Sequence, residues 1–264
     1  MKKKRIRLSP NQIIAIGFLS IILAGALLLM LPFANRSGQG LSFLDSLFTA
    51  TSATCVTGLV VADTWTQFNL LGQLILLVLI QVGGLGYMTM VLMASMLLGR
   101  KIGLRQRGLM AESVSAERLS DSVALLRYIL TGTAAIEGTG AVLLAFRFIP
   151  ELGFSQGAWY ALFHSVSAFC NAGFDLMGFR EPYSSLTHYV YDPLVNLTAC
   201  ALVLLGGLGF LVWRDVWEKG LHFRRYSLHS KLILTATVLL TLGGAALFWL
   251  AERANLLAGM SPAQ

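Results

Sequence analysis

The stretch Leu47–Gly58, LFTATSATCVTG, recurs 115 residues later as Leu162–Gly173, LFHSVSAFCNAG, with the same residue at six of the twelve positions. A second motif follows each copy: Gly83–Tyr87, GGLGY, recurs 123 residues later as Gly206–Phe210, GGLGF. Two motifs that recur in the same order predict two copies of one structural unit. An even number of membrane crossings between them gives both copies the same orientation, which makes this a parallel repeat.

Each copy contains a short apolar segment that is followed by small and hydroxyl residues. Phe43–Thr51 and Ala158–Ser167 are apolar but only about ten residues long, whereas a membrane-spanning helix needs about 20. Non-helical backbone at membrane depth is tolerated where it is buried in protein or lines a watery cavity. The pattern therefore predicts a half-helix that enters the membrane and an extended strand that returns, which together form a re-entrant loop.

Backbone carbonyls along such a strand can replace the hydration shell of a cation. A glycine allows the carbonyls to point inward, and the half-helix directs the negative end of its dipole toward the cavity below. Ser42 and Asp45 match a capping box at the start of the first half-helix. We predict an ion selectivity filter with these residues: Thr54, Cys55, Val56, Thr57, Gly58, Phe169, Cys170, Asn171, Ala172 and Gly173. The alternative is a pair of interfacial hairpins in a membrane scaffold.

Composition places these loops in an integral membrane protein. The 264 residues are 56% apolar and 12% charged, whereas a soluble domain has about 25% charged residues. This balance excludes disorder, a basic nucleic-acid-binding domain and most soluble enzymes. Five stretches are apolar and long enough to span a bilayer: Ile13–Leu31, Leu70–Leu98, Ser122–Ile149, Leu194–Trp213 and Leu232–Leu250. The predicted fold class is an all-α membrane protein with parallel span–re-entrant pore loop–span repeats.

The net charge of +7 follows the membrane topology and does not indicate nucleic-acid binding. Segments 2–7, 100–127 and 214–231 hold 16 of the 20 basic residues, and five alternating spans place all three segments on one side. The positive-inside rule makes that side cytoplasmic, and the N-terminus with it. The first apolar stretch is longer than the usual ~7–15 residues of a signal peptide, so we expect a retained helix. The predicted location is the plasma (inner) membrane.

The repeat suggests five segments along the chain. Residues 1–99 and 122–213 are the two span–loop–span units, and residues 100–121 and 214–231 are cytoplasmic linkers. Residues 232–264 contain the first span of an incomplete third unit.

The filter segments resemble those of the Trk/Ktr/HKT potassium-transporter superfamily. Ala50–Leu59 resembles its first filter and Ser167–Asp175 its second, and Asp192–Asn196, Gly206–Phe210 and His229–Leu232 are also similar to its sequences. The resemblance covers essentially the whole chain. A first span close to the N-terminus resembles KtrB-type subunits, because Trk-type subunits have two extra leading helices.

The resemblance implies a channel-like subunit for K⁺ uptake, which in this superfamily can depend on Na⁺ or pass Na⁺. It further implies a homodimer, a cytosolic nucleotide-binding regulatory subunit of the KtrA type, contact with membrane lipid, and no cofactor besides the transported K⁺. Members of the superfamily carry four such units around one pore, whereas this sequence has two units and one further span. We therefore expect it to be the N-terminal part of a longer protein.

Several side chains have both a structural and a functional interpretation. Glu137 lies within a span, where pairing inside the bundle is favoured over a proton relay. His164 is expected to be packed and hydrogen-bonded, with a pH sensor as the alternative. Cys55 and Cys170 are expected to be small fillers behind the pore lining, since the pair lacks further metal ligands. The glycine-rich motifs favour close helix packing over nucleotide binding.

Two other classes of function remain as alternatives. A non-conducting membrane subunit that docks partners would depend on basic residues such as Arg105 and Arg107. An enzyme finds little support, because the sequence contains no HExxH, GxSxG or paired-carboxylate motif.

Overall fold

The computed structural model describes residues 10–86, 122–220, 222–253 and 255. Helices make up most of this part, which contains no named β-strand and one isolated bridge between Asn35 and Phe68. The chain divides into two compact units, Met1–Val203 and Leu204–Gln264.

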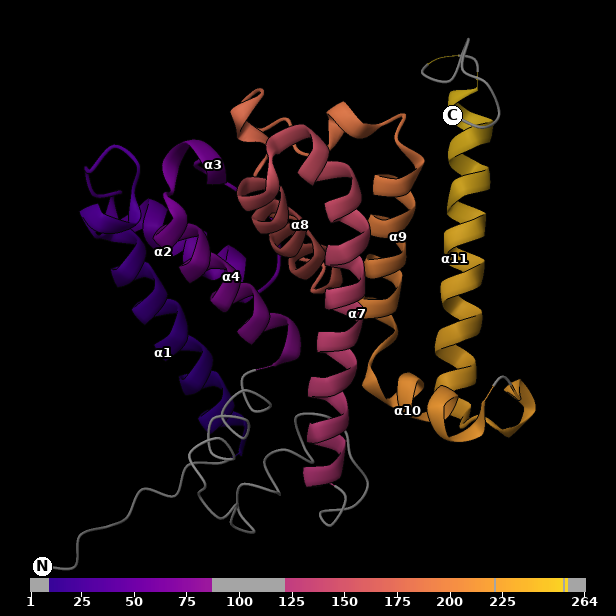
Figure 1. Ribbon diagram of the computed structural model, residues 1–264. Helices are drawn as coiled ribbons and strands as arrows, with labels where there is room; N and C mark the ends of the chain where they lie inside the picture. Colours follow the sequence, from indigo (N-terminus) through magenta and orange to yellow (C-terminus); the bar gives the residue numbers. More distant parts are fainter. Residues whose placement is uncertain (1–9, 87–121, 221, 254, 256–264) are drawn as a thin grey trace, which may run out of the picture. The chain divides into compact units, whose positions relative to one another are not determined.

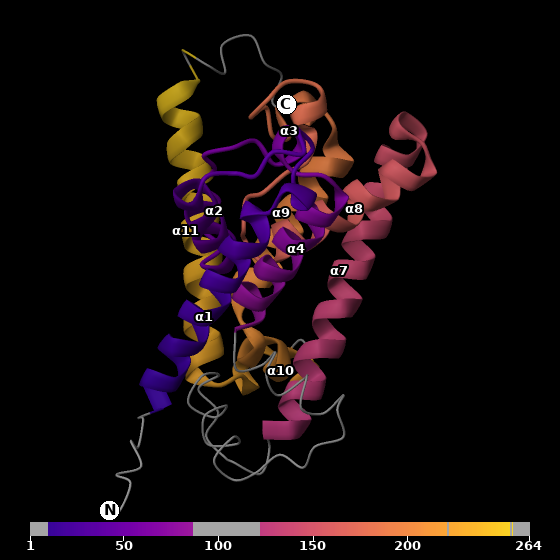
Figure 2. The same cartoon turned by 90° about the vertical axis from the view of Figure 1, so that its left-hand side faces the viewer.

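The first unit begins with three helices that pack against one another (Figure 1; Figure 2). α1 (Pro10–Met30) leads through a 3-10 turn (Pro32–Ala34) to α2 (Phe43–Thr54). A one-turn helix, α3 (Thr64–Gln67), precedes α4 (Leu70–Leu85). These helices build the first copy of the repeat.

In the second copy, two packed helices are likewise followed by a loop and a further helix. α7 (Ser122–Leu152) packs along α8 (Phe154–Phe169), and α8 also contacts α4 of the first copy. Two 3-10 turns, Met177–Phe179 and Thr187–Tyr189, connect α8 to α9 (Pro193–Leu208).

The two short helices are longer than the sequence predicted. The apolar stretch Phe43–Thr51 begins with α2, which continues to Thr54, and Ala158–Ser167 is the inner part of α8, which extends beyond it at both ends. Hydropathy detects only the apolar part of each helix, so the polar first turn of α8 was missed. The predicted cap of α2 is present, because the Ser42 hydroxyl accepts the Asp45 amide at 3.1 Å. In a capping box, the carboxylate of Asp45 would accept the backbone amide of Ser42. Here the Asp45 carboxylate instead accepts the Ser42 hydroxyl, at 2.7 Å.

Matched glycines pack the long helices together in both copies. A Cβ at Gly25 of α1 would lie 2.7 Å from the Leu79 side chain of α4. A Cβ at Gly140 of α7 would lie 2.8 Å from the Leu202 side chain of α9. Gly25 and Gly140 are separated by 115 residues, and Leu79 and Leu202 by 123, which are the offsets of the two sequence motifs. The same positions therefore make the same close helix contact in each copy.

The predicted span Leu194–Trp213 is bent in the structure. α9 ends at Leu208, and α10 (Phe210–Lys219) continues at an angle of 94° to it. Gly209 between them has φ +81°, a conformation that glycine adopts without steric cost. Hydropathy did not reveal this break, because the residues on both sides of Gly209 are apolar.

In the second unit, a buried carboxylate joins α10 to α11 (Leu228–Glu252). Asp215 of α10 accepts hydrogen bonds from the Ser227 amide (2.8 Å) and the Ser230 hydroxyl (2.7 Å) at the start of α11. These bonds tie α10 to the first turn of the last helix.

The helices fit a multi-pass membrane protein. Three are long and apolar enough to cross a bilayer, Gln12–Met30, Arg127–Leu152 and Leu228–Glu252, and α9 with α10 makes a fourth if taken as one bent span. Of the predicted span Leu70–Leu98, the structure describes the part up to Gly86. The rest of that span and the basic residues 100–121 lie outside the described residues.

Candidate functional site: the loops after α2 and α8

The loops after α2 and α8 follow the same backbone course. In each, three successive amides at the helix end donate to carbonyls of the last helical turn. The matched amide–carbonyl pairs are Cys55–Thr51 and Cys170–Val166, Val56–Ala53 and Asn171–Ala168, and Thr57–Ser52 and Ala172–Ser167. The sequence repeat is therefore also a repeat of hydrogen bonding.

Each loop adopts the left-handed conformation at two matched positions. Val56 and Asn171 have φ of 49° and 58°, and Gly58 and Gly173 have φ of 73° and 72°. Asparagine tolerates this region, but for a β-branched valine it is a genuine outlier. Strain of this kind persists where the surroundings fix the backbone, and it is concentrated at functional sites.

The two loops meet at their glycines. A Cβ at Gly58 would lie 2.8 Å from the carbonyl oxygen of Ala172 and 3.3 Å from the Cα of Gly173. A Cβ at Gly173 would lie 3.2 Å from the Cα of Gly58. Glycine is thus required at both positions by conformation and by the close approach of the other loop. The structure brings together the C-terminal ends of the two predicted filter segments.

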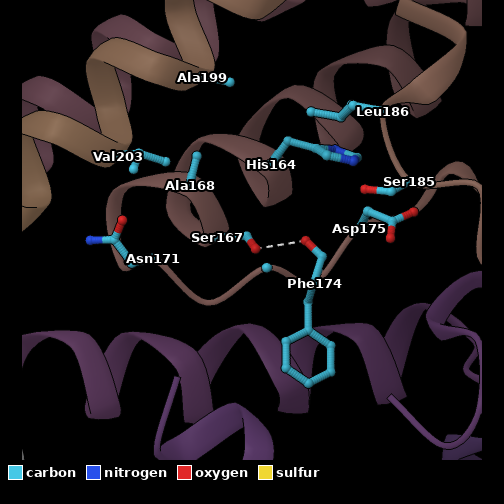
Figure 3. Close-up of a pocket in the computed structure, with 11 residues that line it drawn as sticks. His164, Ser167, Ala168, Asn171, Phe174, Asp175, Ser185, Leu186, Ala199 and Val203 are labelled. Atoms are coloured by element: carbon cyan, nitrogen blue, oxygen red, sulfur yellow. Dashed lines mark hydrogen bonds between the residues drawn. The ribbon is translucent and has the colours of Figure 1, made fainter. Parts of the chain in front are cut away.

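Side chains of the two helices brace the loops in different ways. Ser52 and Thr57 share a hydrogen bond of 2.9 Å between their hydroxyl oxygens. The matching Ser167 instead donates to the carbonyl oxygen of Phe174 at 2.6 Å (Figure 3). The ring of Phe174 points away from this bond, toward a violet helix of the first copy (Figure 3).

His164 is packed and hydrogen-bonded, as predicted. Its side chain is 4% exposed, Nδ1 lies 2.7 Å from the Tyr160 carbonyl, and Nε2 accepts the Leu176 amide at 3.3 Å. Because Nε2 accepts a hydrogen bond, the neutral ring carries its proton on Nδ1. The matching Thr49 also donates to the carbonyl four residues earlier, that of Asp45, at 2.8 Å.

A cavity of about 250 Å³ lies beside the second loop. Ser167, Asn171 and Asp175 line it from α8 and the loop, and Ala199 and Val203 line it from α9 (Figure 3). Asp175 accepts the Met177 amide at 2.9 Å. The second loop therefore has open space on the side of α9.

The two cysteines differ in environment. Cys170 is buried, and Gly84 of α4 lies against it, so that a Cβ at Gly84 would clash with its side chain. Cys55 is exposed. The prediction of a packed filler is confirmed for Cys170 and wrong for Cys55 in the described part of the chain. The packing role predicted for the glycine motif is confirmed at Gly83 and Gly84, which lie against Thr54 and Cys170.

A carboxylate that was not predicted as a site residue joins the segments that follow the two loops. Asp63 is 5% exposed and accepts the amides of Thr66 (2.8 Å) and Tyr183 (2.9 Å). Beside it, the rings of Trp65 and Phe179 make an edge contact with centroids 6.2 Å apart. The sequence contained a local signal for the bond to Thr66, because Asp63 lies three residues before it, as a helix cap does. The bond to the Tyr183 amide depends on tertiary structure and had no such signal.

No group of three or more metal-ligating side chains occurs within the residues that the structure describes.

Comparison with known proteins places the chain among cation transporters. The profile of the TrkH family, described as cation transport protein, matches residues 4–253. Potassium/sodium uptake protein NtpJ of Enterococcus hirae is 44% identical over 257 residues. Ktr system potassium uptake protein B is 44% identical over 237 residues in Bacillus subtilis and over 257 residues in Vibrio alginolyticus.

These matches cover nearly all of this chain but about half of each relative. The aligned part is 97%, 90% and 96% of this chain, and 56%, 52% and 54% of the three relatives in the same order.

Proposed function

Because the chain belongs to the TrkH family of cation transport proteins, we propose that it forms part of a K⁺ uptake pathway across the plasma membrane as a KtrB-type translocating subunit. The observation that carries the proposal is the meeting of two matched loops at Gly58 and Gly173. Both loops lie at the ends of helices of the kind that enter a membrane part-way. The family and the names of the three relatives support the choice of ion.

In this mechanism, a K⁺ ion sheds water and is coordinated by backbone carbonyls of 54–58 and 169–173. These carbonyls replace the hydration shell, and the C-terminal ends of α2 and α8 add the negative ends of their dipoles. The two loops supply two sides of a coordination ring, and further loops of the same kind complete it.

Selectivity for K⁺ over Na⁺ is moderate in this proposal. Each loop has one glycine, Gly58 or Gly173, in place of a longer glycine-containing filter sequence. Fewer carbonyl sites can be arranged in succession along such a loop. One relative is itself named a potassium/sodium uptake protein, which agrees with a pathway that admits both ions.

The finer assignments rest on the family. We propose that the subunit works as a homodimer with a KtrA-type cytosolic nucleotide-binding subunit, uses no cofactor, and has a cytoplasmic N-terminus. The distribution of 16 of the 20 basic residues over three segments supports this orientation.

The proposal is tested by expressing the complete gene product in bacteria that lack their own K⁺ uptake systems. The wild type should restore growth at low K⁺ and take up Rb⁺ in preference to Na⁺. Gly58→Ser should reduce this preference at an unchanged amount of membrane-inserted protein. A matched control is Gly38→Ser, because Gly38 also has a positive φ (+67°) but lies in open space away from the loops.

Two outcomes would contradict the proposal. A wild type that restores no growth, although it is inserted in the membrane, would favour a docking subunit that does not conduct. A Gly58→Ser protein with wild-type Rb⁺ and Na⁺ uptake would show that the ion does not pass these loops.

A further inference from the structure

Glu137 occupies a buried position in the middle of a membrane-spanning helix. It lies in α7, halfway between Ser122 and Leu152, and is 8% exposed. Its backbone carbonyl accepts the hydroxyl of Ser165 of α8 at 2.6 Å. An ionisable residue at such a position is costly and by default a candidate for function.

Its carboxylate is bound by one neutral side chain. Nε2 of Gln81 in α4 donates to both carboxylate oxygens, at 3.0 and 3.3 Å. Within the described part of the chain, no Lys, Arg or His forms an ion pair with Glu137. Burying a carboxylate without a cation is unfavourable, and an alkyl side chain would fill this space at lower cost.

The amide oxygen of the Gln81 side chain reaches the start of the second loop. Its Oε1 lies 4.0 Å from Sγ of Cys170, which can donate its thiol proton. Gly84, one turn along α4, lies against the same cysteine. Cys170 is the C-cap residue that directly follows α8, and Asn171 with its positive φ comes next. The direction in which the loop leaves α8 therefore depends on how Cys170 is held.

The two polar side chains of this connection are not repeated at the matched positions of the sequence. The residues that match Glu137 and Gln81 under the repeat offsets are Ile22 and Leu204, both apolar. The matching cysteine, Cys55, is exposed. The polar connection thus belongs to the contact between α4 of the first copy and α7 of the second, and the repeated sequence does not dictate it.

We propose that Glu137 is a positioning residue that, through Gln81, holds Cys170 and so sets the course of the second loop. As a consequence, it tunes how strictly the pathway discriminates between cations. The effect on discrimination rests on the proposed function, whereas the effect on Cys170 does not.

The first test follows the reaction of Cys170 with a membrane-permeant maleimide by peptide mass spectrometry, in the complete gene product. Glu137→Ala removes the acceptor that orients the Gln81 amide, and Gln81→Ala removes the partner of Cys170 itself, so each should raise the labelling rate of Cys170 about tenfold. Cys55 is the internal reference and should react at an unchanged rate. Thr139→Ala is the matched control on α7, because Thr139 is exposed and bonds only within its own helix.

An exchange of the pair separates positioning from a general loss of packing. Gln81→Glu alone places two carboxylates face to face and should raise the labelling of Cys170 at least as much. Adding Glu137→Gln recreates the donor–acceptor pair in reverse, and labelling should return to within about twofold of wild type. If the double variant stays as reactive as Gln81→Glu, or if Glu137→Ala leaves Cys170 unchanged, the proposal is overturned.

The transport test uses the same proteins and compares Rb⁺ and Na⁺ uptake. Glu137→Ala should lower the Rb⁺/Na⁺ preference by about tenfold, and the exchanged pair should restore it. Equal loss of uptake for both ions, with an unchanged preference, would overturn the role in discrimination. A wild type that transports neither ion would contradict the proposed function instead, and the labelling results would still decide whether Glu137 positions Cys170.

Discussion

The loops after α2 and α8 have the same backbone but different support. Both have matched hydrogen bonds and matched positive φ values, and their glycines meet. Around the second loop, Cys170 is packed against α4 and Ser167 holds a loop carbonyl, whereas Cys55 of the first loop is exposed. The comparison shows that the local sequence specifies the loop conformation, while its environment comes from neighbouring helices.

The largest effect is expected where the loops meet. Gly58→Ala and Gly173→Ala both add a Cβ at a positive φ, but at Gly58 it would be 2.8 Å from the Ala172 carbonyl oxygen. The nearest atom to a Cβ at Gly173 is the Gly58 Cα at 3.2 Å, which leaves more room. We expect both variants to reduce Rb⁺ uptake by more than about tenfold, with Gly58→Ala the more severe. A milder effect at Gly58 than at Gly173 would contradict this geometry.

The matched serines should differ in their contribution to stability. Ser167 is buried and holds the Phe174 carbonyl, so Ser167→Ala leaves that acceptor unpaired and should cost about 1–3 kcal/mol of unfolding free energy. Ser52→Ala leaves the Thr57 hydroxyl to rotate to another partner and should cost about 1 kcal/mol or less. Unfolding in detergent followed by tryptophan fluorescence measures both. Equal losses would mean that the second loop is not more firmly braced.

Substitution of the non-glycine residue with positive φ in the first loop should raise the unfolding free energy. Val56→Asn replaces a strained residue by one that tolerates φ 49°, and should stabilise the protein by about 1 kcal/mol. The reverse change in the other loop, Asn171→Val, should destabilise it by a similar amount. The same unfolding measurement applies. A destabilised Val56→Asn protein would show that the valine side chain makes contacts that outweigh its strain.

The smallest effect concerns the caps of α4 and α9. Asn69 accepts the amides of Leu71 (2.9 Å) and Gly72 (3.1 Å), and Asp192 accepts the matching amides of α9 at 3.0 and 3.2 Å. Partial desolvation raises the pKa of Asp192, but the Val195 amide, the Arg147 guanidinium and the Leu194 amide together hold that pKa below its ordinary value of 3.8.

A carboxyl whose pKa is lowered by folding stabilises the fold above the unfolded value, and this contribution is lost as the pH falls through the folded pKa. The cap of α9 should therefore weaken below about pH 4, by less than about 1 kcal/mol because the Arg147–Asp192 pair is partly exposed to solvent. The uncharged cap of α4 at Asn69 should not titrate. Asp192→Asn should remove this acid-dependent part of the unfolding free energy, and an unchanged pH profile would refute the assignment.

The sequence predicted the elements whose signals are local. The apolar stretches located α1, α7 and α11, and Ser42 marked the start of α2. The repeat located both loops, because the cysteine that follows each helix and the glycine with positive φ are identical in the two copies.

Features that depend on a distant partner were not predictable. The bend at Gly209 lies within a continuous apolar stretch, and the burial of Asp63 depends on an amide 120 residues away. Pairing of Glu137 within the bundle was predicted, but its partner Gln81, on another helix, was not. Gln81 did leave one signal, as a polar residue in the uncharged stretch Leu70–Leu98.

The central claim is that a cation passes between the two loops and is bound by their carbonyls. Crystals of the complete gene product soaked in Tl⁺, a heavy substitute for K⁺, test it most directly through anomalous diffraction. We expect a Tl⁺ peak coordinated by carbonyl oxygens of 54–58 and 169–173, and the loss of this peak in Gly58→Ser. Tl⁺ bound elsewhere in the membrane region, with none between Gly58 and Gly173, would contradict it.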